Sequence, residues 1–184
     1  EVVKSPKEKE DIIRELFRVF FERVQNNKEL VEYFITEENN AGFTPLHSAL
    51  ENGNPENFEI YMGAVNALDQ GIRQQLLAGA NKAGFTPLHQ ALKNGTQENF
   101  KRYMEAVNLL DKGIRQQLLV GANKAGFTPL HDALINGNPE NFEIYMGAVE
   151  SLDKGIRQQL LAGANKAGFT PLHQALINGN PENF

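Results

Sequence analysis

The chain has 184 residues, 41% of them hydrophobic, which is enough for a substantial folded core. A net charge of −5 without any run of Lys or Arg argues against nucleic acid or an anionic membrane as the main partner, because both attract basic surfaces. The absence of cysteine excludes disulfides, thiolate metal sites and cysteine nucleophiles.

A segment of six residues, Gly-Phe-Thr-Pro-Leu-His, recurs at a constant spacing along most of the chain. Its copies begin at Gly42, Gly84, Gly126 and Gly168. A repeat of this length predicts an all-α helical repeat solenoid, in which each unit buries its apolar face against its neighbours. The predicted units are residues 42–83, 84–125 and 126–167, followed by a partial fourth unit, 168–184.

Residues 1–41 are expected to form an N-terminal helical cap, a degenerate unit that lacks its first helix. Phe34 and Ile35 match the leucine pair near the end of the later units, and the apolar residues within 17–24 match those of a second helix. Residues 4–18 are more charged than their counterparts. A terminal unit of a solenoid needs one polar outer face, so we expect this cap to present one to solvent.

Each full unit is expected to contain three helices, and the third unit shows the signals. Thr128 can cap a first helix that ends near residues 136–137. Asn138 can cap a second helix, whose apolar residues recur at spacings of three and four. Asp153 is the candidate cap of a third helix, which ends near Gly163.

The partial fourth unit is expected to contain a first helix with an uncovered outer side. Residues 168–184 stop before most of a second helix would form. We therefore expect that the array continues or that another molecule covers this side, which makes end-to-end self-association of the chain an alternative role.

The motif Thr-Pro-Leu-His-x-Ala, followed by Asn-Gly, resembles the ankyrin repeat. Its copies span Thr44–Ala49, Thr86–Ala91, Thr128–Ala133 and Thr170–Ala175. The segment Leu-Leu-x-Gly-Ala that precedes the next copy is also similar to that family. The resemblance implies that the motif histidine ties neighbouring units by hydrogen bonds, and that the first helices form the concave binding side.

The unit differs from an ordinary ankyrin repeat in its length, which is 42 residues against about 33. The link from Leu77 to Thr86 is too short for the hairpin finger of ankyrin repeats, whereas the stretch from His47 to Leu76 has room for an extra helix. We therefore expect an ankyrin-like first helix within a three-helix, armadillo-like stack. Binding through hairpin tips does not carry over.

Candidate chemistry is weak along the whole chain. The motif histidines of neighbouring units should lie about 10 Å apart, too far to share a metal ion whose ligands lie about 2 Å from it. The loop 79–84 has the glycine spacing of a phosphate-binding loop, but Phe85 and Thr86 replace the Lys-Ser/Thr pair. Thr44 beside His47 would need an orienting third group to act as a nucleophile. We expect no catalytic site, no metal and no cofactor.

Arginine recurs on the third helices, each time followed by two glutamines. The three copies are Arg73, Arg115 and Arg157. Such a row could bind an acidic partner, but we favour a solvated or hydrogen-bonding role between units, because single exposed charges contribute little.

Positions that differ between units indicate where a partner could bind. The residue after each motif histidine, and the residue three further on, share one helix face; they are Ser48, Glu51, Gln90, Lys93, Asp132, Ile135, Gln174 and Ile177. A core position would not accept Glu, Lys and Ile interchangeably, so we expect this face to be exposed and to bind the partner. Neutral drift at exposed sites is the alternative. A second exposed set is expected on the second helices, at Ile60, Gly63 and their copies Arg102, Glu105, Ile144 and Gly147.

These observations predict a non-catalytic scaffold that binds a protein or peptide partner in a preformed concave groove. A structural spacer, an end-to-end assembly module and an accessory domain of a larger enzyme or effector are the alternatives. We expect no nucleic-acid or membrane partner. No signal peptide or long apolar segment is visible, so an intracellular, cytoplasmic protein is expected, with an exported effector as the alternative.

Overall fold

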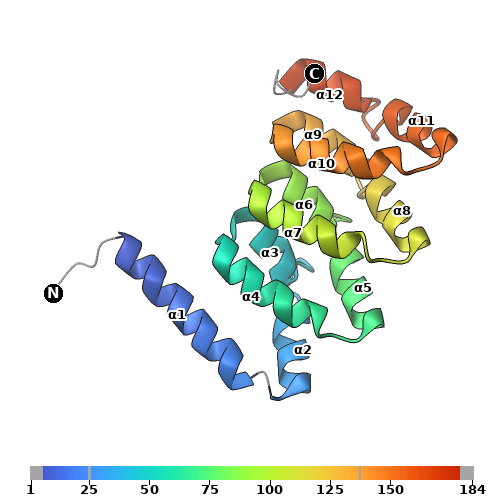
Figure 1. The fold of residues 1–184 in the computed structure, drawn as a ribbon. Helices are drawn as coiled ribbons and strands as arrows, with labels where there is room; N and C mark the ends of the chain where they lie inside the picture. Colours follow the sequence, from blue (N-terminus) through green and yellow to red (C-terminus); the bar gives the residue numbers. More distant parts are fainter. Residues whose placement is uncertain (1–5, 25, 137, 179–184) are drawn as a thin grey trace.

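A computed structural model describes residues 6–24, 26–136 and 138–178, and these residues form helices and short loops without any strand (Figure 1). The helices are α1 Pro6–Val24, α2 Lys28–Thr36, α3 Pro45–Asn52, α4 Pro55–Asn66, α5 Gln70–Ala78, α6 Pro87–Asn94, α7 Gln97–Val107, α8 Lys112–Val120, α9 Pro129–Asn136, α10 Pro139–Glu150, α11 Lys154–Ala162 and α12 Pro171–Asn178. The predicted all-α class is confirmed.

The helices form three rows that run along the stack (Figure 1). First helices pack side by side in the order α3, α6, α9 and α12, and second helices in the order α1, α4, α7 and α10. In the third row α5 packs on α8. Contacts are closest between first helices, so their row is the tightly packed side of the stack.

Most helices begin at the predicted capping residues. Thr86 donates its backbone N–H to Nδ1 of His89 at 3.2 Å, which closes a capping box at the start of α6. Asn138 accepts the N–H of Asn141 at 3.1 Å and caps α10. Asp153 occupies the N-cap position of α11, but its side chain makes no hydrogen bond to the helix. Its negative charge still lies at the positive end of the helix dipole.

The loop before each first helix joins neighbouring units through backbone hydrogen bonds. Asn81 accepts the N–H groups of Ala83 and Phe85 at 2.9 Å each, which fixes the turn. Lys82 then donates its backbone N–H to the carbonyl of Ala41 in the preceding loop at 3.1 Å. Lys124 and Lys166 make the same bond one and two units later. The loops therefore form a ladder along one edge of the stack.

The glycine that opens the six-residue segment is required by this ladder. Gly84 has φ +87°, in the left-handed region that glycine favours, and a Cβ there would lie 2.8 Å from the backbone nitrogen of Lys124. Glycine at this position therefore lets two neighbouring loops approach closely.

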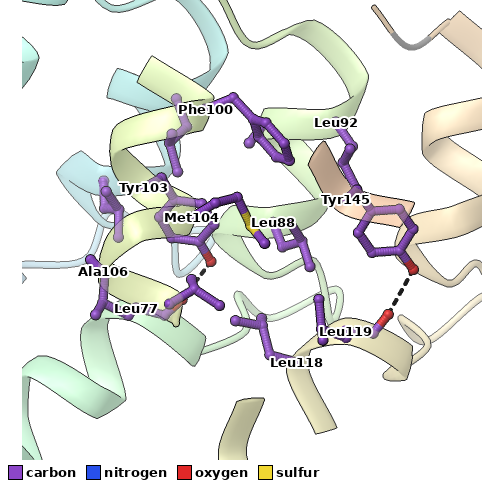
Figure 2. Packing of buried hydrophobic residues seen from close by; sticks show 14 of the residues in the cluster. Leu77, Leu88, Leu92, Phe100, Tyr103, Met104, Ala106, Leu118, Leu119 and Tyr145 are labelled. Carbon is purple, nitrogen blue, oxygen red and sulfur yellow. Dashed lines mark hydrogen bonds between the residues drawn. The ribbon is translucent and has the colours of Figure 1, made fainter. Parts of the chain in front are cut away.

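The apolar core runs without interruption through the seams between units (Figure 2). Tyr103 and Tyr145 are fully buried on the second helices, and each donates its hydroxyl to a carbonyl at the end of the preceding third helix. The acceptors are Leu77 and Leu119, both at 2.7 Å. Each tyrosine thus adds a hydrogen bond to the apolar stripe that the sequence predicts, which satisfies a polar group that burial would otherwise penalise.

Helices α1 and α2 occupy the second and third rows, and no first helix precedes α3 in the described residues (Figure 1). Phe17 and Phe21 pack against the core from one side of α1. The exposed surface at this end is mixed rather than uniformly polar, because Leu16, Phe20 and Phe34 are exposed together with charged residues of α1. These charged residues pair along the helix, as Arg18 does with acidic neighbours three and four residues away.

The other end of the stack has the uncovered side that the sequence predicts. Leu172 and Leu176 of α12 are 58% and 75% exposed, whereas Leu130 and Leu134 at the same positions of α9 are buried. Among the described residues, no helix combines the length and the apolar character that crossing a bilayer requires.

Candidate functional site

The motif histidines tie each unit to the next. Nδ1 of His89 accepts the N–H of Thr86, so Nε2 carries the ring proton and donates it to the carbonyl of Phe127 at 3.1 Å. His47 and His131 make the equivalent bonds to Phe85 and Phe169. Burial lowers the pKa of His89 to about 4, and it also lowers the pKa of His47 and His131. These three rings are therefore neutral and fully used in structural bonds.

The remaining candidates for chemistry are also occupied by structural bonds. The Thr86 hydroxyl lies 2.7 Å from His89 Nδ1, but Nε2 of that ring contacts a backbone carbonyl rather than an orienting carboxylate. In the loop 79–84, the N–H groups of Lys82 and Gly84 bond to backbone carbonyls of the ladder and the turn. Within the described ranges, no group of three or more His, Asp or Glu side chains is arranged to hold a metal ion.

The position after each motif histidine does not form the exposed face that we predicted. Gln90, Asp132 and Gln174 are only 8%, 6% and 8% exposed, and the prediction of exposure is wrong for these three. The position faces the first helix of the preceding unit, which covers it. Ser48 alone is exposed, because no first helix precedes α3 in the described residues.

Asp132 is a buried carboxyl at the seam between α6 and α9. Its Oδ2 atom has no hydrogen-bond partner in the described part of the chain. Burial raises the pKa of Asp132 to about 7, and the positive charge of Lys93 opposes this shift. The other units carry neutral or amide side chains here, so the third unit holds a charge that its surroundings do not satisfy.

The position three residues further on is more accessible. Lys93 and Ile177 are exposed, while Glu51 and Ile135 are half-buried. Glu51 accepts a hydrogen bond from Asn94 of the next unit at 3.3 Å, which occupies part of this surface. We call Ser48, Glu51, Lys93, Ile135 and Ile177 the first-helix strip; their role in binding stays a prediction.

Three of the variable positions of the second helices, Gly63, Arg102 and Glu105, line a groove between α4 and α7. Gly63, Glu105 and Gly147 are exposed as predicted, and Arg102 is half-buried. The α4–α7 groove has a volume of about 500 Å³, and six of the residues that line it are Met62, Gly63, Arg102, Glu105, Ala106 and Leu109. Leu109 is 79% exposed, the most exposed large apolar side chain of the described residues.

Charged side chains form the rim of the α4–α7 groove. Arg102 lies 3.3 Å from both Glu59 and Glu98. Arg73 donates to the carbonyl of Asn66 at the end of α4, at 3.1 Å, and Arg115 makes the same contact in the next unit. Both contacts lie within one unit, so they show a hydrogen-bonding role for these arginines but not the role between units that we expected. A cation at a helix C-terminus is stabilising.

The second helices are acidic as a group. Helices α4, α7 and α10 contain seven glutamates against two basic residues, Lys101 and Arg102. Their surface therefore attracts positive charge and repels phosphate groups.

Sequence reasoning missed Leu109 although a signal was present. The same position is Ala67 in the first unit and Ser151 in the third, so a large apolar side chain occurs there only in the second unit. The groove itself depends on the spacing of two packed helices, which no local pattern encodes.

Comparisons with known proteins add no family to this description. A scan against models of protein families found no match, and a search among curated proteins found no similar sequence.

Proposed function

We propose that the chain is a non-catalytic scaffold that binds a protein or peptide segment in the α4–α7 groove. One observation carries the proposal. Three exposed or half-buried residues differ in the second unit from their counterparts and line this one groove: Arg102 and Glu105 on α7, and Leu109 in the turn that follows α7. The first and third units carry Ile, Gly and a small residue at these positions.

The groove has the mixed character of a recognition surface. Leu109 supplies exposed apolar contact area beside the buried Met62 and Ala106, and glutamates at the rim supply direction. A suitable partner segment presents one apolar side chain flanked by basic residues, because the surrounding second helices are acidic. The helices on either side are held by buried seams, so little ordering is required on binding.

The ankyrin-like motif supports a binding role by analogy of architecture, and it does not locate the surface. In ankyrin relatives the first helices form the binding side, which corresponds here to the first-helix strip. We therefore keep the first-helix strip as the competing surface, to be separated by experiment from the α4–α7 groove.

A peptide-display selection against the intact chain provides the probe. Selected peptides are expected to lose at least about tenfold in affinity when the three groove residues are replaced by those of the third unit, Arg102→Ile, Glu105→Gly and Leu109→Ser. The matched control on the first-helix strip is Glu51→Ile, which introduces the residue of the third and fourth units. Binding is measured by fluorescence anisotropy, with circular dichroism to confirm that each variant is folded.

The alternative surfaces give opposite results. If the Glu51→Ile variant loses affinity and the triple variant keeps it, the first-helix strip is the binding surface and the α4–α7 groove is not. If selection yields no binder that distinguishes either variant from the parent chain, the proposal of a binding scaffold fails.

A further inference from the structure

The three rows of helices are out of step at the two ends of the stack (Figure 1). In the described residues the second and third rows begin with α1 and α2, one unit before the first row begins with α3. At the opposite end the first row extends to α12, one unit beyond α10 and α11. Within the described residues, one end therefore has no first helix, and the other has a first helix, α12, without an accompanying second or third helix.

The face of α12 and α11 is one half of an ordinary seam. Leucines that face the following unit are buried inside the stack and exposed at this end; the pairs are Leu119 and Leu161, Leu130 and Leu172, and Leu134 and Leu176. The exposed members are 53%, 58% and 75% accessible, against 0%, 1% and 9% for their counterparts. Covering three leucines that are normally buried is a favourable change in apolar area.

The outer face of α1 and α2 is the other half of that seam. Phe20 and Phe34 occupy the positions of Tyr145 and Leu160, which face the preceding unit and are 0% and 4% exposed. The two phenylalanines are 38% and 41% exposed, and the centroids of their rings lie 5.1 Å apart. Leu16 beside them is also exposed. An unpartnered apolar face is thus present at both ends.

Hydrogen-bonding groups at the two ends match as well. His173 bonds to Thr170 as the other motif histidines do, but within the described chain its Nε2 has no following carbonyl to donate to. The matching carbonyl of the first loop belongs to Phe43, which accepts from Asn39 and from no histidine in the described chain. Elsewhere in the stack the corresponding carbonyl accepts both bonds.

We propose that copies of this chain stack head to tail, so that α12 of one copy fills the missing first-helix place before α3 of the next. In this arrangement α1 and α2 of the second copy pack on α10 and α11 of the first, and the joint repeats the seam found inside the chain. The contact joins two different faces, so it continues as an open array rather than closing as a dimer.

The joint is weaker than an internal seam. Phe20 has no hydroxyl, whereas Tyr145 donates one to the carbonyl of Leu119. One hydrogen bond between units is therefore not made at the joint. Association is accordingly reversible and depends on protein concentration.

Sedimentation velocity of the 184-residue chain tests the proposal. Between about 1 µM and about 1 mM, the weight-average mass is expected to rise past that of a dimer. A tail variant, Leu172→Glu with Leu176→Glu, and a head variant, Leu16→Glu with Phe34→Glu, should each remain monomeric. The matched control Gln117→Glu introduces the same charge at an exposed side chain of α8, away from both ends, and should associate like the parent.

Mixing the variants gives the sharpest result. The tail variant keeps an intact head and the head variant keeps an intact tail, so an equimolar mixture should form a one-to-one heterodimer that does not grow. A parent chain that stays monomeric over the whole range would overturn the proposal. A tail variant that still associates alone, or a mixture that stays monomeric while each variant is folded by circular dichroism, would overturn it equally.

Discussion

Replacing His89 by alanine is expected to lower the free energy of unfolding by about 3 kcal/mol. The ring is 1% exposed and bonds on both sides, to the N–H of Thr86 and to the carbonyl of Phe127 in the next unit. Alanine leaves the N–H of Thr86 without a partner in a closed site and removes one of the two hydrogen bonds to the carbonyl of Phe127, which keeps the bond from Asn123. It also creates a cavity, and each of these changes is destabilising. Urea unfolding followed by circular dichroism measures the loss.

The chain supplies its own control for this substitution. His173 makes the same bond to its threonine, but it is exposed and no following unit in the described chain accepts its second bond. His173→Ala should therefore cost less than about 1 kcal/mol. Equal losses for the two variants would show that the histidine acts as a local helix cap and not as a tie between units.

Replacing Asp132 by glutamine is expected to raise stability at about pH 8 and to remove the fall in stability that this carboxyl causes as the pH rises. The pKa of the buried carboxyl is about 7, above its ordinary value of 3.8. The folded chain therefore holds a proton that the unfolded chain releases at lower pH. The stabilisation from this proton is fully present below about pH 4, falls as the pH rises, and is lost above about pH 7. The buried histidines act in the opposite direction because their pKa is lowered, so the effect of Asp132 is the difference in stability between the parent chain and the variant.

The size of this effect follows from the pKa difference. A pKa that rises from 3.8 to about 7 on folding corresponds to a loss of at most roughly 4 kcal/mol of stability above neutral pH. Lys93 on α6 is the charged group that acts on Asp132, and it reduces the loss, while α12 contributes the neutral Gln174 at the neighbouring seam. Glutamine is accepted at this position in two other units, where it is equally buried.

Chemical unfolding of the parent chain and of Asp132→Gln at several pH values between about 4 and 8 tests this expectation, with Gln90→Ser as an uncharged control at the same position of the second unit. The control should leave the slope of stability against pH unchanged, and the stability of Asp132→Gln relative to the parent should increase as the pH rises. A difference between these two chains that stays constant across this range would contradict the account of Asp132.

The sequence predicted the helices well because their signals are local. Thr-Pro at the start of each first helix and Asn-Pro at the start of α4 and α10 fix the boundaries through capping and the geometry of proline, and both act within one turn. The spacing of the repeated segment then placed these helices in a stack, because each apolar face needs a neighbouring unit.

The exposed surface is harder to predict, because a position whose residue differs between units need not face solvent. Lys93 and Glu105 at such positions do face solvent, whereas Gln90 and Asp132 lie in the seams. A distinguishing signal was present, since the exposed position takes Glu, Lys and Ile while the seam position takes only small or uncharged polar residues and one Asp. A seam tolerates polar side chains of limited size, but it penalises an ion that lacks a partner, as Asp132 does.

The ends of the stack could not be predicted from composition. Many charges in the first eighteen residues indicated a polar outer face, yet Leu16 and Phe20 lie exposed between them. Which side of α1 faces outward depends on how it packs against α4, a tertiary contact that the charge pattern does not contain.

The repeated histidines hold neighbouring units together, and we propose that recognition is left to residues that are not repeated. Proton–nitrogen NMR of the histidine rings tests the structural role of the repeated residues, because it reports which nitrogen carries the proton and how fast that proton exchanges. We expect Nε2-protonated, slowly exchanging rings for His47, His89 and His131 at neutral pH, and rapid exchange for His173 in the dilute chain. Four histidines that exchange alike would contradict this role.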